Sequence, residues 1–213
     1  VPLSVGLKDL LSGIVKQCNE LGDFLSPSFM VTNVKKMSFE EIERIASVAA
    51  RLGISRIRLT GGEPLVRKGV IELAGELMKL PGIEDVSLTT NGILLTEHAA
   101  ALRRSGMRRI NISLDTLKKQ RFLEMTRRDE LEHVLDGIDA AIATGFSPVK
   151  INVVVQRGIN DDEIVDLATF GRNKGVEVRF IEYMPLDADG TWQNSQVVGQ
   201  DEIVDTIAKV YPL

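Results

Sequence analysis

The sequence is poor in cysteine and lacks an excess of basic residues. Cys18 is its single cysteine, so an internal disulfide is excluded, and one thiol cannot hold a zinc ion or an iron-sulfur cluster. The 26 Lys and Arg residues stand against 30 Asp and Glu, a net charge of -4, which argues against the broad basic surface of nucleic-acid binders. A small anionic ligand is compatible with that charge, because a few local cations can bind phosphate on an acidic protein.

Long apolar runs and targeting signals are also missing. No run reaches the roughly 18 residues that cross a membrane, and the first residues lack the basic region, apolar core and cleavage site of a signal peptide. We therefore expect a soluble protein with no membrane partner, in the cytoplasm of a bacterium or the mitochondrial matrix of a eukaryote. The hydrophobic share of 44% and the length of 213 residues fit one globular domain.

Helical and strand-like patterns alternate from Ser38 onward, which is typical of repeated βα units and a parallel sheet. Ser38 and Glu41 match a capping box, and Gly53 suits the end of the helix that they begin. Short runs rich in Ile, Val or Leu predict strands at residues 56–60, 85–89, 108–114, 150–156 and 177–183. Helical spacing predicts further helices at residues 69–80, 96–105, 131–144, 162–174 and 201–210. The sequence therefore predicts an α/β fold.

A polar cluster follows each of three predicted strands. The clusters are G-G-E-P at residues 61–64, T-T-N-G at residues 89–92 and S-L-D at residues 113–115. Such βα units wind into an open sheet or curve into a barrel, and no G-x-G-x-x-G supports dinucleotide binding of the Rossmann kind. Ligand sites of parallel α/β folds form at the carboxyl ends of the strands. We therefore expect the three clusters to meet at one mouth.

Each of these features also has a plain structural interpretation. Paired glycines suit a tight turn with a solvated Glu63, Asn-Gly is a common turn pair, and Asp115 is best explained as a helix cap. Arg58 and Lys150 either form ion pairs at the rim or bind an anion such as phosphate. The first 37 residues do not follow the βα alternation: they predict an amphipathic helix and then a loop or short strand at residues 26–36.

Five motifs occur in the order and spacing of one known family. They are R-L-T-G-G-E-P-L-V-R, T-T-N-G, I-N-I-S-L-D-T-L, P-V-K-I-N-V-V-V and V-R-F-I-E-Y-M-P-L-D. From about Ser38 to its end the chain resembles the molybdenum cofactor biosynthesis protein A family, MoaA, whose members are radical S-adenosylmethionine (SAM) enzymes called GTP 3',8-cyclases. The resemblance implies a partial parallel βα barrel, similar to a TIM barrel, with its first strand missing or replaced.

The resemblance also assigns ligand contacts. Gly62, Glu63, Ser113 and Met184 match the family's SAM contacts, and Glu63 is expected to face the methionine amino group. Arg58, Thr89 and Lys150 match its GTP contacts. In such enzymes a reduced 4Fe-4S cluster cleaves SAM, and the radical starts the conversion of GTP to 3',8-cyclo-7,8-dihydroguanosine triphosphate, a lyase reaction of molybdopterin biosynthesis. The product passes to the cyclic pyranopterin monophosphate synthase, and a homodimer is compatible with the resemblance.

The chain departs from the family in its cysteines. The family's C-x-x-x-C-x-x-C motif and three later cysteines are absent, so we assign no metal ligand and no catalytic residue, and expect the chain as written to be inactive. Residues 1–37 form an atypical N-terminal segment, in which residues 4–36 are interpreted as an insertion or a retained intron. Residues 38–213 are interpreted as a radical SAM core truncated at its C-terminal end. The alternative is a cluster-less, non-catalytic nucleotide-binding relative or an inactive fragment.

Overall fold

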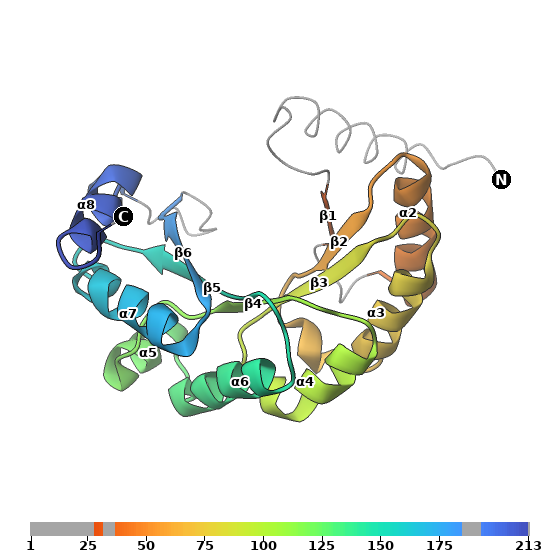
Figure 1. The fold of residues 1–213 in the computed structure, drawn as a ribbon, viewed down its shortest axis with the longest axis horizontal. Coiled ribbons are helices and arrows are strands. Elements are labelled where there is room, and N and C mark those ends of the chain that lie inside the picture. Colours follow the sequence, from red (N-terminus) through yellow and green to blue (C-terminus); the bar gives the residue numbers. More distant parts are fainter. Residues whose placement is uncertain (1–27, 32–36, 185–192, 213) are drawn as a thin grey trace. The chain divides into compact units, whose positions relative to one another are not determined.

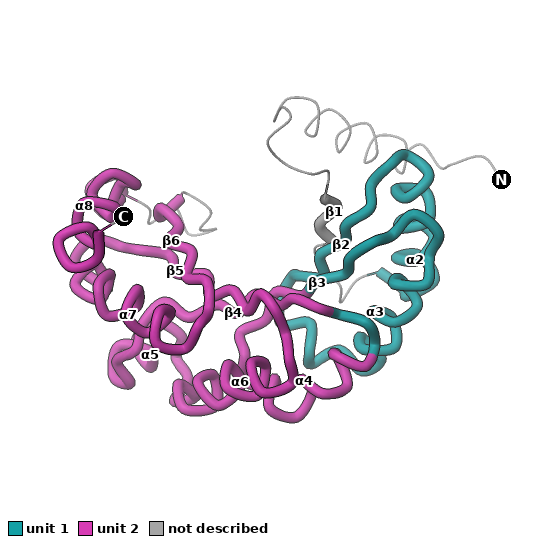
Figure 2. Tube along the Cα trace, in the orientation of Figure 1, with its two compact units in different colours: residues 1–87, 105–107 teal, residues 88–104, 108–213 magenta. Residues whose placement is uncertain are grey.

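The computed structural model describes residues 28–31, 37–184 and 193–212 (Figure 1). They belong to two compact units (Figure 2): unit 1 takes residues 1–87 and 105–107, and unit 2 takes residues 88–104 and 108–213. In both units the strands pair in parallel, with helices between them, so the α/β prediction is confirmed. Among the described residues, no helix combines the length and apolar character needed to cross a membrane.

In unit 1, helix α2 (Phe39–Arg51) starts at the predicted capping box. Glu41 N donates a hydrogen bond to Ser38 Oγ at 3.1 Å, and Ser38 N donates to Glu41 Oε2 at 2.8 Å. These bonds satisfy backbone donors that the first turn of a helix leaves without partners. Gly53 follows the helix with a φ of 89°, the left-handed conformation that ends many helices.

Two parallel strands of unit 1 lie on either side of α2 in the sequence. Strand β1 (Ser28–Val31) pairs with β2 (Arg56–Leu59). The family resemblance implies a first strand that is missing or replaced, and β1 lies within residues 26–36, the stretch that predicts a loop or short strand. In β2, Ile57 and Leu59 are buried and Arg58 lies on the other face. Two helices follow, the 3-10 helix η2 (Pro64–Val66) and α3 (Val70–Lys79).

Unit 2 holds parallel strands in the order β3-β4-β5-β6. Each strand lies close to its predicted bounds: β3 (Asp85–Thr90, which enters from unit 1), β4 (Ile110–Ser113), β5 (Val149–Val155) and β6 (Glu177–Glu182). The helices between and after them are α4 (Leu95–Arg104), α5 (Lys119–Thr126), α6 (Leu131–Ala143), η3 (Asp161–Glu163), α7 (Ile164–Lys174), η4 (Asn194–Gln196) and α8 (Gln200–Ala208). This alternation makes each connection a crossover that returns the chain parallel to itself.

The side chains of strand β5 alternate between the two faces of this sheet. Ile151, Val153 and Val155 are fully buried and alternate with the half-buried Lys150 and Asn152. Helix α6 packs against β5, α7 packs against β6, and α4 lies beside α6 (Figure 1). The apolar side chains of β5 therefore form the core with the helices, and the polar ones lie on the opposite face.

The sequence does not predict helix α5. Phe122 is its one buried residue, so its apolar pattern is too weak to stand out from a loop. The helix ends at Arg127, whose φ of 60° is uncommon for a residue other than glycine. The usual glycine signal for a helix end is therefore missing here too.

Candidate functional site

One face of the sheet in unit 2 is lined with polar side chains. Partner residues of neighbouring parallel strands share a face, and the register aligns Thr89, Asn111, Lys150 and Glu177 in one row across β3, β4, β5 and β6. The next row contains Ser113, Asn152 and Arg179. These two rows are termed the polar face. It brings together three of the predicted ligand residues, Thr89, Ser113 and Lys150.

A carboxylate bridges two cations on the polar face. Lys150 Nζ lies 2.9 Å from Glu177 Oε1 and 2.8 Å from Glu177 Oε2, and Arg179 Nε donates to Glu177 Oε1 at 2.7 Å. Hydrogen bonds from Lys150 and then Arg179 hold the pKa of Glu177 below its ordinary value. Of the two interpretations of Lys150, an ion pair or the binding of an anion such as phosphate, the structure shows the ion pair. Phosphate binding stays a prediction.

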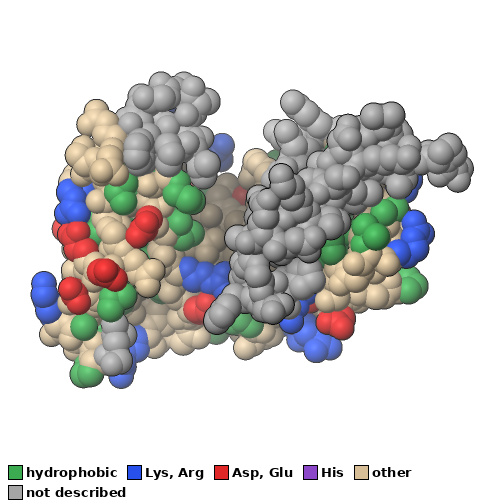
Figure 3. Space-filling model, turned by 90° about the horizontal axis from the view of Figure 1, so that it is seen from above, with side chains coloured by type: hydrophobic (Ala, Val, Ile, Leu, Met, Phe, Trp, Pro, Cys, Tyr) green, Lys and Arg blue, Asp and Glu red, His purple; other side chains and the backbone are tan. Residues whose placement is uncertain are grey.

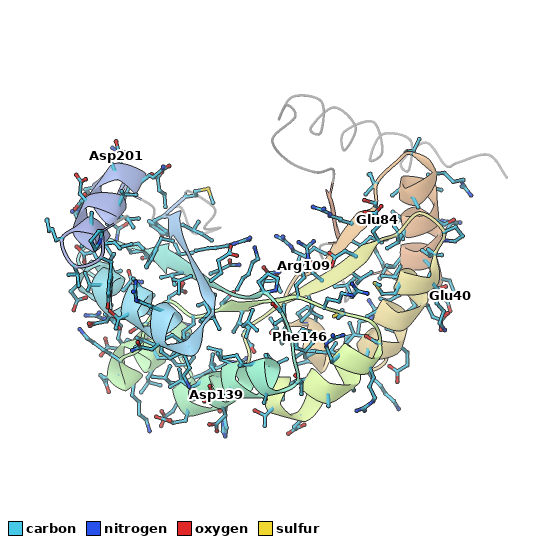
Figure 4. The ribbon with its side chains drawn as sticks, viewed as in Figure 1. Glu40, Glu84, Arg109, Asp139, Phe146 and Asp201 are labelled. Atoms are coloured by element: carbon cyan, nitrogen blue, oxygen red, sulfur yellow. The ribbon has the colours of Figure 1, made fainter. Side chains whose placement is uncertain are left out.

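A further cation lies beside the polar face. Arg109, directly before β4, is on the side of the sheet away from α4 and α6, whereas Asp139 of α6 lies on the outer side (Figure 4). Arg109 therefore adds a further cation on the side of the sheet that carries the polar face. On the face of the molecule seen in Figure 3, Lys and Arg side chains are interspersed with Asp and Glu side chains.

The T-T-N-G cluster is mainly a turn. Thr90 Oγ1 accepts a hydrogen bond from Gly92 N at 3.1 Å, and Asn91 Oδ1 accepts from Ile93 N at 3.0 Å. Gly92 has a φ of 83°, and a Cβ there would lie 3.0 Å from Ile112 Cγ2, so this position requires glycine. Thr89 alone belongs to the polar face.

Asp115 is not a helix cap, so that prediction is wrong. Its Oδ1 accepts a hydrogen bond from Val154 N at 2.7 Å, which ties the loop after β4 to β5. Asn160 Nδ2 reinforces the tie by donating to Asp115 O at 2.7 Å and to Val154 O at 2.9 Å. Burial raises the pKa of Asp115, against the opposing effect of the bond from Val154. The partner is 39 residues away, where local capping rules cannot find it.

Glu163 fixes the next part of the same loop. It is 0% exposed, and it accepts hydrogen bonds from Thr116 Oγ1 at 2.7 Å and from Leu117 N at 2.8 Å. Arg121 pairs with the same carboxylate. Asn160 and Glu163 were not predicted from the sequence. The available signal was an amide and a carboxylate in the connection that follows β5, which ends at Val155, on the side of the sheet where the loops after parallel strands meet.

Three predicted ligand residues, Arg58, Gly62 and Glu63, lie in unit 1. Glu63 Oε1 accepts from Leu65 N at 3.0 Å and caps η2, so its carboxylate takes part in the turn that was its structural interpretation. Gly62 has a φ of 55°, and no atom lies within 4 Å of the position of a Cβ, which leaves room for a ligand. The convergence of these residues with the polar face stays a prediction.

The donor atoms of this chain do not fit an iron-sulfur cluster. Cys18 is the only cysteine of the sequence and lies outside the described residues. Within the described part, no group of three or more His, Cys, Asp or Glu side chains could hold a metal ion. The predicted SAM contacts fit a ligand better, because Ser113 is exposed at the end of β4 and Met184, just after β6, is 49% exposed.

Sequence comparison identifies relatives over most of the chain. A GTP 3',8-cyclase of Moorella thermoacetica is 52% identical over 177 residues, which cover 83% of this chain and 54% of that protein. One from Rhodopirellula baltica is 45% identical, with 82% and 49% covered, and one from Geobacter sulfurreducens is 45% identical, with 94% and 62% covered. The chain thus spans about half to three fifths of the length of these relatives.

Solved structures and a family model give the same answer about the fold. Methylornithine synthase (PylB) superposes with a TM-score of 0.67 at 15% identity, covering 98% of this chain and 69% of that one. The hydrogenase maturase HydG superposes with a TM-score of 0.62 at 14% identity, covering 94% and 54%. These likenesses confirm the prediction of a barrel-like α/β fold. The model of the Radical SAM superfamily matches residues 26–171, and this chain belongs to that superfamily.

Proposed function

We propose that this chain is the nucleotide-binding core of a GTP 3',8-cyclase, the enzyme that converts GTP to 3',8-cyclo-7,8-dihydroguanosine triphosphate. One observation carries the proposal: Thr89 and Lys150, which match GTP contacts by motif, lie in the same row of the polar face. The relatives named GTP 3',8-cyclase support it, among them the protein of Moorella thermoacetica at 52% identity. In this proposal GTP is the substrate, and the product passes to the cyclic pyranopterin monophosphate synthase.

The proposal gives the cations of the chain one task, which is to bind and orient the triphosphate. Lys150 and Arg58 form charge-assisted hydrogen bonds to phosphate oxygens, and Thr89 supplies a hydroxyl. Arg179, which motif matching did not assign, adds a second cation close to Lys150 through Glu177. Holding the phosphates in place restricts the ribose and base to one position, which is how a binding site contributes to a reaction rate.

The second ligand of the proposal is SAM. Gly62 lets the backbone approach the ligand, Glu63 accepts hydrogen bonds from the methionine amino group, and Ser113 and Met184 are further SAM contacts. Cleavage of SAM needs cluster cysteines that this chain lacks. In this proposal the residues present bind and orient ligands, and they do not supply the redox step.

A second candidate is a non-catalytic nucleotide-binding relative, which the single cysteine of the sequence favours. Both candidates bind nucleotide, and they differ in whether the gene encodes the cluster cysteines. Sequencing the mature transcript separates them. The enzyme requires a message in which cluster motifs flank the core, whereas a message that retains residues 6–30 and encodes no such motif favours the relative.

Titration calorimetry of GTP against the expressed chain tests the shared binding site. Lys150→Ala is expected to weaken GTP binding about tenfold, because a charge-assisted contact is worth about 1.5 kcal/mol. Lys174→Ala is the matched control: that lysine also forms an ion pair, 2.5 Å from Asp139 Oδ1, but on an outer helix. GTP binding that is unaffected by Lys150→Ala, or equally weakened by Lys174→Ala, would refute the site.

The same preparation tests the expected lack of activity. Iron and sulfide analysis should find no cluster, and incubation with SAM and a reductant should release no 5'-deoxyadenosine, because the chain lacks the thiolates that hold such a cluster. Detection of 5'-deoxyadenosine from this chain would contradict the expected lack of activity.

A further inference from the structure

Glu177 is the anion that Lys150 and Arg179 bind on the polar face. We propose that Glu177 is an internal counter-ion that competes with the ligand's phosphates for Lys150 and Arg179, and so sets the affinity of the polar face for phosphorylated ligands. This inference rests on the proposed function, because it concerns the ligand of the same site. It adds a residue that the motifs do not assign.

The geometry makes the competition direct. Both carboxylate oxygens of Glu177 are in use: Lys150 Nζ lies within 2.9 Å of each, and Arg179 Nε donates to Oε1 at 2.7 Å. A phosphate oxygen binds the same donors at similar distances. Carboxylate is planar and phosphate is tetrahedral, but both are oxygen anions that accept hydrogen bonds from Lys and Arg. A phosphate that binds at Lys150 Nζ or Arg179 Nε therefore competes with the carboxylate for the donors that Glu177 now uses.

The three side chains differ in exposure, which favours the carboxylate as the partner that gives way. Lys150 is 14% exposed, whereas Glu177 is 45% exposed and Arg179 is 37% exposed. The lysine is held within the sheet, while the carboxylate can turn to water at little cost because water replaces its hydrogen bonds. Ligand binding on this face is therefore an exchange of one anion for another, in which Glu177 is released to solvent.

The exchange has a consequence for affinity. The free energy of the ion pairs to Glu177 is lost when phosphate binds, so the carboxylate weakens every ligand that uses these cations. A ligand without phosphate does not displace Glu177 and is not affected. Neutralising Glu177 should thus tighten binding of triphosphates by about three- to tenfold, the range expected for losing one or two partly exposed ion pairs.

The experiment compares Glu177→Gln with Glu182→Gln. Both remove one negative charge from β6, but Glu182 aligns with Val155 and so lies on the other face of the sheet from Glu177. Its Oε1 accepts from Gln200 N at 2.7 Å, and glutamine keeps that acceptor. Calorimetry measures the affinities for GTP, inorganic triphosphate and guanosine at two salt concentrations, with circular dichroism as a check that both variants are folded.

Glu177→Gln is expected to bind GTP and inorganic triphosphate about three- to tenfold more tightly, with a steeper salt dependence, and guanosine as the unmodified chain does. Unchanged or weaker triphosphate binding would overturn the inference and make Glu177 a residue that positions Lys150. If Glu182→Gln tightens triphosphate binding equally, the effect comes from net charge and the inference about Glu177 is overturned. If inorganic triphosphate responds as expected but GTP binds to neither form, the proposed function fails and the counter-ion role stands.

Discussion

Replacing Glu163 by glutamine tests the buried clamp on the loop after β4. The side chain is 0% exposed, and it accepts from Thr116 Oγ1 and Leu117 N while pairing with Arg121. Glutamine keeps one oxygen, but its amide group sets N–H against one of those donors and removes the charge opposite Arg121. A hydrogen bond to a charged group is worth about 1.5–3 kcal/mol, and a buried partner left unpaired adds to the loss. We expect unfolding free energy to fall by about 2–4 kcal/mol.

The matched control is Asp162→Asn, one position earlier. Asp162 pairs with the same Arg121 at 2.6 Å but is 51% exposed, so its loss should cost below about 1 kcal/mol. Urea unfolding at neutral pH, followed by circular dichroism, measures both. On heating, Glu163→Gln should lower the midpoint by roughly 5–15 °C. If Asp162→Asn is as destabilising as Glu163→Gln, burial is not what makes the clamp strong, and the reasoning fails.

Two further predictions concern packing and acid stability. Gly137→Ala should lower the stability of the folded chain by about 1–3 kcal/mol in thermal unfolding, because the added Cβ would lie 2.4 Å from Gly92 O. Gly75→Ala is the control: its Cβ would lie 3.7 Å from Ser105 Cβ, so this variant should be neutral or stabilising. A Gly75→Ala variant less stable than Gly137→Ala would contradict the packing. Arg121 and then Lys118 lower the pKa of Asp162 from 3.8 to about 2, so Asp162 contributes stability above pH 4 that is lost as the pH falls toward 2. The stability difference between the unmodified chain and Asp162→Asn should disappear over that interval in pH-dependent urea titrations, and a difference that stays constant would exclude the ion pair as its source.

Local patterns were enough to predict most of the elements in the described part of the chain. The strands lie near their expected bounds because each is a short β-branched run between helix ends and polar turns. The capping box at Ser38 and Glu41 formed as predicted, since both of its bonds join residues three positions apart. Helix α5 was not predicted, because Phe122 is its one buried side chain and a single apolar position gives no helical pattern.

The polar face could be predicted only in part, because its rows depend on strand register. Thr89, Ser113 and Lys150 were found by motif, whereas Asn111, Glu177 and Arg179 join them through pairings between distant residues. Alternation along β5 marks Lys150 and Asn152 as sharing a face, and that much can be seen in the sequence. The bond between Asp115 and Val154 N crosses 39 positions, which is why a local capping rule gave the wrong partner.

The strict alternation in β5 also limits how this chain can change in evolution. Lys150 and Asn152 alternate with Ile151 and Val153 along the strand. Inserting or deleting one residue within β5 would therefore move a lysine into the apolar core against α6 and an isoleucine onto the polar face. Length changes in homologous genes should consequently be found in the connections between elements, while β5 itself keeps its residue count.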